Sequence, residues 1–229
     1  MITSRDNAKL KLVRALQRKQ ERDETGLFAC EGEDLVDAAA AAGIEPVELL
    51  VAGENVEPEL LAAVSTLAHP PRAIGVYRAA DLPRGTRDTV LALWQVGDPG
   101  NVGTLLRTAD AFEAGVALSP GCADPLGPKA LRASAGAVFR VPLVAWDEVP
   151  GRRVALVAHD GVALAEIDLD RPVTLYLGAE RLGLPEDLIA GFERATIPLP
   201  GPAESLNVAA AGAIALYELS CRRSADSER

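Results

Sequence analysis

Short apolar segments alternate with segments of helical spacing along most of the chain. Between Leu27 and Arg78 the runs LFAC, VELLV and AIGVYR predict strands, and the stretches EDLVDAAAAAG and EPELLAAVSTLA predict amphipathic helices. Residues 80–89 (ADLPRGTRDT) carry Pro, Gly and charges without apolar periodicity, which is typical of a linker. The pattern therefore predicts a small α/β domain over residues 1–79, followed by a linker over 80–89.

A second unit begins at Val90 and keeps the same alternation. Its predicted strands cover residues 91–96, 115–119, 139–144, 153–159, 173–178 and 195–199. Its predicted helices cover residues 101–112, 128–135, a short stretch near Glu186, and 204–221. Apolar strands without a polar face, separated by helices, indicate a mostly parallel sheet that is covered on both sides. We expect an α/β domain over 90–221 and a frayed tail over 222–229.

Length and composition exclude several classes of protein. The 229 residues are 48% hydrophobic, enough to bury a core, so the chain is not disordered as a whole. Charges, Gly or Pro interrupt every apolar run well before the roughly 20 residues that span a bilayer. The N-terminus lacks the apolar segment of a signal peptide, the three cysteines form no CxxC pair, and two isolated histidines offer no metal-ligand cluster. We expect a cytoplasmic protein without a membrane partner or a metal.

The charge of the chain is unevenly distributed. The net charge is −10, yet residues 1–22 hold seven basic and two acidic side chains, which gives +5 there and −15 over the rest. In a single helix that begins near Thr3 or Ser4, four of the basic residues recur at spacings of three and four and form one stripe. These residues are Lys11, Arg14, Arg18 and Arg22. The stripe is either a solvated helix face or a surface that binds an anion.

Three segments rich in Gly, Pro, Asn and lone charges follow predicted strands, where open α/β sheets place their ligands. The first is GDPGNVGTLLRTADAF, residues 97–112, whose glycines at 97, 100 and 103 would let backbone amides approach an anion at the helix start. Taken alone, the spacing is a weak signal, Asn101 is interpreted as a helix N-cap and Arg107 as a surface arginine.

The other two segments are LGAERLGLP (177–185) and IPLPGPAESLNVAAAGAIALYEL (197–219). In the former, Glu180 is either a loop surface charge or a partner for a ligand or for Arg107. In the latter, three prolines stiffen a loop that leads into a helix, and capping is the default explanation for Ser205 and Asn207.

The three segments together, in this order, resemble the motifs of the SpoU-type (TrmH-like) RNA ribose 2′-O-methyltransferases of the SPOUT superfamily. The similarity covers residues from about 90 to 221, and DPLGPKALRASAGAVFRVPL between the motifs also follows the family pattern. The N-terminal region is similar, less specifically, to the ribosomal-protein-like substrate-binding domain of family members. Glu113 departs mildly from the pattern, because Gly commonly follows the Phe of the first motif, and Leu182 occupies a variable position.

The resemblance implies a C-terminal domain with a trefoil knot, S-adenosylmethionine as cofactor, and a homodimer whose active site combines residues from both subunits. Positions that match cofactor contacts are Leu177, Gly178, Ile197, Leu199, Ser205 and Leu206. Positions that match the catalytic set are Asn101, Arg107, Glu180, Ser205 and Asn207. The implied activity is methylation of a ribose 2′-hydroxyl in structured RNA.

The chemistry of the reaction assigns roles to these matched residues. A ribose hydroxyl is a poor nucleophile, so the site must align the reacting atoms and stabilise alkoxide character. A guanidinium with a pKa above about 12 gives up its proton reluctantly. We therefore interpret Arg107 as a clamp on the phosphate beside the target ribose and as an electrostatic stabiliser rather than a base. Glu180 suits a salt bridge to a guanidinium, and Asn207 suits a two-way hydrogen bond. By the resemblance, Asn101 matches a family position that orients the arginine or the substrate.

The RNA substrate is less sharply indicated. A separate N-terminal domain is typical of family members that resemble ribosomal RNA methyltransferases, so we favour 23S rRNA over tRNA. A non-catalytic RNA-binding homologue is the alternative from another functional class, and the intact catalytic set argues against it. The basic stripe at residues 11–22 is the first candidate for RNA contact, with Arg132 and Arg140 as competing anchors in the catalytic domain.

Overall fold

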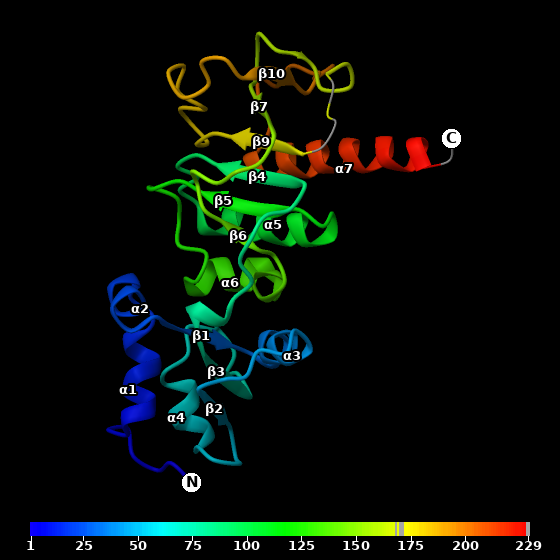
Figure 1. Cartoon of the computed structure of the whole chain (residues 1–229). Coiled ribbons are helices and arrows are strands. Elements are labelled where there is room, and N and C mark those ends of the chain that lie inside the picture. Colours follow the sequence, from blue (N-terminus) through cyan, green and yellow to red (C-terminus); the bar gives the residue numbers. More distant parts are fainter. Residues whose placement is uncertain (168, 170–171, 228–229) are drawn as a thin grey trace.

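The computed structural model describes residues 1–167, 169 and 172–227, and it shows two stacked units, each built on its own sheet (Figure 1). The N-terminal sheet has three antiparallel strands in the order β1-β3-β2. The C-terminal sheet has seven strands in the order β6-β5-β4-β9-β7-β10-β8, and the neighbouring strands pair in parallel. The α/β class and the parallel sheet are confirmed.

The elements follow the predicted alternation closely. The N-terminal unit contains α1 (Ala8–Ala15), α2 (Lys19–Thr25), β1 (Leu27–Glu31), α3 (Glu33–Ala41), β2 (Glu48–Val51), α4 (Pro58–Ala62), β3 (Ala73–Arg78) and the 3₁₀ turn η1 (Ala79–Asp81). The C-terminal unit contains β4 (Thr89–Leu93), α5 (Pro99–Ala111), β5 (Gly115–Leu118), α6 (Pro128–Ser134), η2 (Ala137–Phe139), β6 (Leu143–Val144), β7 (Arg152–Leu156), β8 (Val162–Ala163), β9 (Val173–Leu177), β10 (Glu193–Thr196) and α7 (Val208–Ser227).

The N-terminal basic segment is not one helix. It forms α1 and α2, which are separated at residues 16–18, so the predicted single stripe was wrong. Leu16 is buried, and no apolar residue follows it until Leu27, so a continued helix would have no face to bury. Gly26 then ends α2 in the left-handed conformation.

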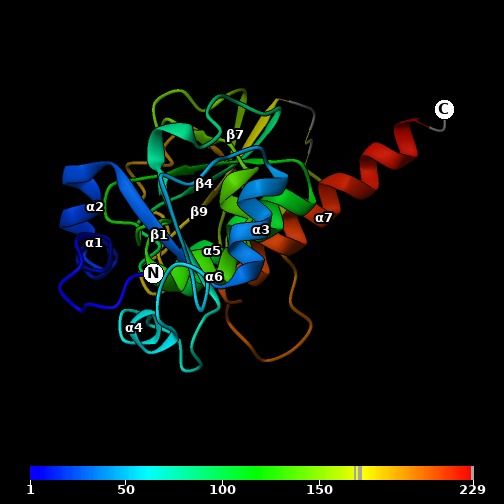
Figure 2. The same cartoon turned by 90° about the horizontal axis from the view of Figure 1, so that it is seen from below.

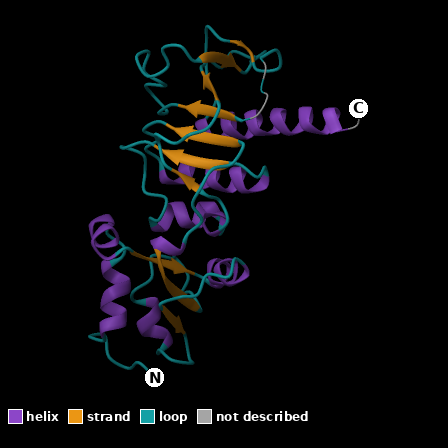
Figure 3. Ribbon diagram, in the orientation of Figure 1, coloured by secondary structure: helices purple, strands orange, loops and turns teal. Residues whose placement is uncertain are grey.

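The two faces of the large sheet are covered differently: helices lie on one face and loops on the other (Figure 3). One face packs against α5 and α7, and it contributes Leu91, Leu93 and Leu175 to the main core. The other face is covered by loop residues, among them Trp146 and Phe192. The helix expected near Glu186 is absent from the described chain, because residues 185–192 form turns instead.

The two units share a buried interface. Phe28 and Tyr77 of the N-terminal sheet pack with Phe139 of η2, with ring centroids 5.3 to 6.1 Å apart. This contact corrects the strand predicted over 139–144: Phe139 belongs to a 3₁₀ turn and is buried at the interface, and only Leu143–Val144 form β6. Polar contacts across the same interface include the ion pair of Arg22 with Asp124 and the hydrogen bond from Arg132 to Thr66.

The last helix extends away from the body of the molecule (Figure 2). We expected residues 222–229 to fray, but α7 runs on to Ser227, and residues 228–229 lie outside the described chain. Arg222 holds this turn of α7 in place, because its guanidinium donates to the carbonyl oxygens of Ile167 and Leu164 at 2.6 and 2.7 Å. It also pairs with Glu218, four residues earlier, at 3.1 Å.

Candidate active site

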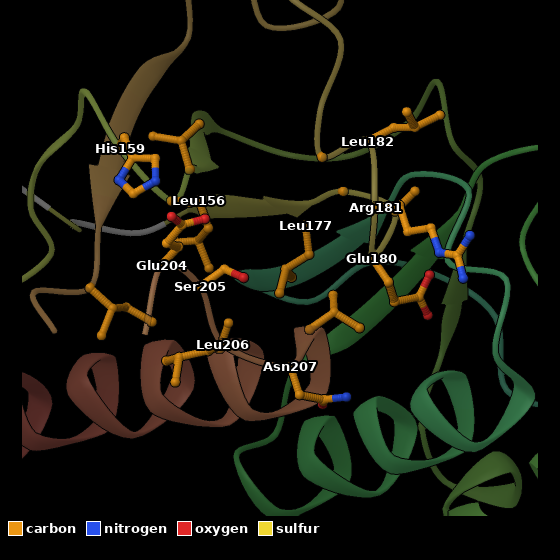
Figure 4. A pocket seen from close by; sticks show the side chains of 18 of the residues that line it. Leu156, His159, Leu177, Glu180, Arg181, Leu182, Glu204, Ser205, Leu206 and Asn207 are labelled. Atoms are coloured by element: carbon orange, nitrogen blue, oxygen red, sulfur yellow. The ribbon is translucent and has the colours of Figure 1, made fainter. Parts of the chain in front are cut away.

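The carboxyl ends of β4 and β9 lie side by side, and the loops that follow them meet the start of α7 (Figure 4). Asp98 begins α5, because its carboxylate accepts hydrogen bonds from the backbone amides of Gly100 and Asn101 at 2.7 and 3.1 Å. Pro99 occupies the first helical position. Asp98, and not Asn101, is the N-cap, so the interpretation of Asn101 as a capping residue was wrong.

Asn101 instead joins the three sequence segments. Its Nδ2 donates to Glu180 Oε1 at 2.9 Å, and its Oδ1 accepts from Asn207 Nδ2 at 3.1 Å. Asn207 Oδ1 in turn accepts from the amides of Ala209 and Ala210 at 2.9 and 3.3 Å, which caps α7. These hydrogen bonds hold Asn101 to two residues that are distant in the sequence, Glu180 at a separation of 79 positions and Asn207 at a separation of 106.

Two carboxyl groups at this edge have lowered pKa values. A hydrogen bond from Lys129 Nζ, 2.8 Å away, is the largest cause for Asp98, followed by the amide of Asn101. Burial by itself raises the pKa of Glu180, but hydrogen bonds from Asn101 Nδ2 and from the backbone amides of Asp98 and Gly97 outweigh it, so the net shift is downward. Both groups are therefore carboxylates at neutral pH.

The glycines of the first segment do not form an open anion site. The amides of Gly97 and Asp98 point at the Glu180 carboxylate, each at 3.4 Å, and those of the next turn are taken by Asp98. Gly103 has a packing role instead, because a Cβ there would lie 2.3 Å from the carbonyl oxygen of Ala130 in α6. The helix start thus already holds two carboxylates of the chain itself, and the expected approach of an external anion was wrong.

Arg107 lies six residues after Asn101 on α5 and is exposed. The expected salt bridge with Glu180 is not formed, since Glu180 accepts from Asn101 and two backbone amides. Among the described residues, none forms a hydrogen bond or an ion pair with the Arg107 guanidinium, and Arg107 does not line the cavity described next. Its guanidinium is therefore available to a group outside this chain.

A cavity of about 620 Å³ opens between the ends of β7 and β9 and the loop before α7 (Figure 4). All six residues that the sequence matched to cofactor contacts line it: Leu177, Gly178, Ile197, Leu199, Ser205 and Leu206. Glu180 and Asn207 also line it, so the linked polar residues stand at its wall. His159 and Leu156 line it too and were not predicted, although His159 ends the strand predicted over 153–159, which was a usable signal.

The loop before α7 is longer than predicted. We expected the helix to begin near Glu204, but α7 begins at Val208, so Ser205 lies in the loop and the capping role falls to Asn207 alone. Prolines at 198, 200 and 202 cannot donate backbone hydrogen bonds, which keeps this segment out of the helix and the sheet. Ser205 and Glu204 consequently face the cavity instead of continuing α7.

The candidates for RNA contact that reach the surface lie in two regions, one in the N-terminal basic segment and one in the C-terminal unit. Lys11 and Arg18 are exposed and carry only surface ion pairs, with Asp6 at 3.1 Å and Glu21 at 2.6 Å, while Arg14 donates to a backbone carbonyl. Arg132 and Arg140 are exposed as well, but the first donates to Thr66 and the second pairs with Asp110 at 2.7 Å. The exposed ion pairs of Lys11, Arg18 and Arg140 contribute little to stability.

Arg22 does not belong with these residues. Its side chain is 6% exposed, pairs with Asp124 at 2.6 Å and donates to the carbonyl oxygen of Leu16 at 2.6 Å. Its proposed contact with RNA was therefore wrong, because the guanidinium is already occupied at the interface between the units. No sequence pattern marks this pair, whose members are 102 residues apart.

Two kinds of feature are absent from the part of the chain that the structure describes. No group of three or more His, Cys, Asp and Glu side chains there could hold a metal ion. None of the described helices combines the length and apolar character that crossing a membrane requires.

Comparison with known proteins gives two family matches. Residues 88–217 match the SpoU rRNA Methylase family, and residues 7–79 match the MRM3-like substrate binding domain. The chain is 33% identical to the 23S rRNA (guanosine(2553)-2′-O)-methyltransferase RlmP of Bacillus subtilis, over 95% of this chain and 98% of that protein.

Solved structures agree with these matches. The AdoMet-bound rRNA methyltransferase from Sinorhizobium meliloti has a TM-score of 0.84 and 32% identity, over 96% of this chain and 97% of that one. A structure that addresses 2-OH methylation of C/U34 on tRNA has 32% identity and a TM-score of 0.53, and it covers 60% of this chain and 97% of its own.

Proposed function

The chain belongs to the SpoU rRNA methylase family, and from this premise we propose that it methylates the 2′-hydroxyl of one ribose in 23S rRNA. It is an RNA (ribose-2′-O)-methyltransferase that uses S-adenosylmethionine. The observation that carries the proposal is the hydrogen-bonded link from Asn101 to Glu180 and Asn207 at the wall of the cavity. Three separate motifs converge there, as a site for chemistry requires.

The cavity fits the cofactor. Its leucine and isoleucine side chains suit an adenine ring, while Ser205, Glu204 and backbone groups of the 177–183 loop suit the ribose and the charged methionine part. When bound, the cofactor supplies a methyl group on a positively charged sulfur. Gly178 keeps the loop tight, because a Cβ there would lie 2.1 Å from the carbonyl carbon of Gly183.

Substitution of Gly178 is expected to damage this cavity. Gly178→Ala would force residues 178–184 apart, and overpacking of this degree should weaken S-adenosylmethionine binding by at least about tenfold. Gly97→Ala is the matched control, since a Cβ at Gly97 would meet no atom within 4 Å. Isothermal calorimetry on both full-length variants measures the difference, and equal affinities would contradict the assigned cavity.

The side chains of the site have different roles in the proposed reaction. Asn101, Glu180 and Asn207 hold the loops in one arrangement, so the cavity wall is preorganised before RNA binds. Arg107 would clamp the phosphate next to the target ribose and stabilise negative charge on its 2′-oxygen. The phosphate or a water molecule would take the proton, because the guanidinium holds its own.

We extend the proposal to a homodimer with composite active sites. Arg107 does not line the cavity of its own chain, within the described residues, which supports its acting at the cavity of a second copy. Exposed Ile214 and Tyr217 on α7, 40% and 61% accessible, offer apolar surface for such a contact. The proposal includes three further features. They are the trefoil knot implied by the family resemblance, domains at 1–79 and 90–221 with a linker at 80–89, and a cytoplasmic location.

The extent of the matches favours rRNA over tRNA. The rRNA enzymes match nearly the whole chain, including the N-terminal unit, whereas the structure that addresses tRNA covers 60% of it. Transfer of labelled methyl from S-adenosylmethionine to unmodified 23S rRNA, with total tRNA beside it, tests the proposal. We expect label in 23S rRNA. Label in tRNA alone would transfer the proposal to the tRNA alternative, and label in neither would favour the non-catalytic one.

RNA binding is expected to depend on the solvent-accessible part of the N-terminal basic segment. Replacing Lys11, Arg14 and Arg18 with Gln should weaken binding and flatten its salt dependence, by about 0.7 in the logarithmic slope for each phosphate that the protein ceases to neutralise. Arg194→Gln, which removes a surface cation on β10, is the control. Filter binding to 23S rRNA at several salt concentrations gives the slopes, and an unchanged slope in the triple variant would identify a solvated surface.

A further inference from the structure

A second groove, of about 920 Å³, adjoins the cofactor cavity at the end of β4. It shares Glu180, Arg181, Leu182 and Asn207 with that cavity, and Asn101 lies in it as well. A nucleotide whose ribose faced the shared wall would place its base toward this groove. The side chains of Gln95, Arg181 and Leu182 line this groove and have been given no role so far.

Gln95 has a strained backbone. Its φ is +50°, in the left-handed region that non-glycine residues seldom adopt. Its neighbours hold it there, because the backbone N–H of Gln95 donates to Ser119 Oγ at 2.9 Å and the next residue, Val96, is fully buried. A strained residue that its surroundings keep in place is typical of a functional position.

The side chain of Gln95 is exposed. No described residue forms a hydrogen bond with its amide group, which can both donate and accept. At the rim of the same groove Leu182 is 85% exposed, the most exposed large hydrophobic side chain of the described chain. Figure 4 shows Leu182 at the edge of the site, beside Arg181. A polar edge and an apolar contact in one groove are what a nucleobase requires.

We infer that this groove receives the base of the target nucleotide, that Gln95 reads its hydrogen-bonding edge, and that Leu182 contacts its face. The inference rests on the proposed function, since it takes RNA as the substrate. Gln95 lines the groove, and its carboxamide has no hydrogen-bond partner among the described residues. Discrimination between bases then arises because a wrong base leaves the amide without a partner.

The test uses the full-length enzyme and 23S rRNA transcripts. The methylated nucleotide is first mapped with the wild-type enzyme, and transcripts are then made with each of the other three bases at that position. Wild type should prefer the native base in kcat/KM. Gln95→Ala and Gln95→Gly should lower that preference by about tenfold, because each removes the amide. Leu182→Ala should lower kcat/KM for all four transcripts alike.

Glu113→Gly is the matched control. Glu113 follows α5, is exposed like Gln95, has a similar φ of +55°, and lies outside the groove. Glycine relieves the strain at either position, so both glycine variants should melt at or above the wild-type temperature. Only Gln95→Gly should lose base preference.

Three results would overturn the inference. They are a wild-type enzyme indifferent to the base, a Gln95→Gly variant with wild-type preference, and a Glu113→Gly variant that loses preference equally. A wild-type enzyme that transfers no methyl to any rRNA would instead refute the proposed function, which keeps the two failures apart.

Discussion

Arg107→Ala is expected to reduce methyl transfer by at least about a hundredfold while S-adenosylmethionine binds with unchanged affinity. Arg107 is exposed, has no partner among the described residues and does not line the cavity, so its loss leaves the cofactor site intact. Single-turnover methylation of 23S rRNA and calorimetry with S-adenosylmethionine measure the two effects. A large loss of cofactor affinity would show that the guanidinium acts in binding instead.

Arg107→Lys distinguishes charge from geometry. A lysine keeps the positive charge but cannot offer the planar fork that grips a phosphate, so we expect it to fail as well. Substantial activity in the lysine variant would show that charge alone suffices. Mixed dimers of Arg107→Ala with Gly178→Ala should regain part of the activity, because a composite site then forms from the intact half of each copy.

Arg22→Met is expected to destabilise the protein by about 3–5 kcal/mol, since it leaves the carboxylate of Asp124 without its partner in a site that is only 16% exposed. The carbonyl of Leu16 loses its donor too. Urea unfolding followed by circular dichroism measures the change. Arg18→Met is the control, because Arg18 pairs with Glu21 on the surface, with its side chain 70% exposed, and should cost at most about 1 kcal/mol.

The double variant Arg22→Met/Asp124→Leu separates the two explanations of such a loss. Replacing both partners removes the stranded charge, so stability should return in large part. If the double variant were as unstable as Arg22→Met, the loss would come from packing around residue 22 rather than from the carboxylate.

The sequence could predict which segments meet at this edge of the sheet because its motifs are local. Gly, Pro and Asn stand where strands end, and each of the three segments supplies a residue of the Asn101 network two to eight positions after a predicted strand. What the sequence missed depends on contacts between distant residues. Arg22 looked like its basic neighbours, and only its ion pair with Asp124 distinguishes it. Phe139 looked like part of a strand, and its position is set by Phe28 and Tyr77 of the other unit.

The sequence also led to wrong assignments where one residue type suits two different roles. Asn often caps helices, but Asp98 precedes Asn101, and the Asp98 carboxylate accepts from the free backbone amides at the start of α5. Ser205 and Asn207 are both good caps, and the stiff proline loop leaves only Asn207 within reach of the α7 amides. In each case the residue released from capping is one that faces the cavity or links its walls.

The aromatic and ionic interface between the two units has a consequence for how an RNA is chosen. The ring cluster, the Arg22–Asp124 pair and the Arg132–Thr66 hydrogen bond join the N-terminal unit to the unit that carries the cavity. In this arrangement the N-terminal unit and the cavity lie at one defined separation. An RNA that contacted both units would have to present its target ribose at that separation from a second feature of its own fold, and three-dimensional shape would then help to select the nucleotide that is modified.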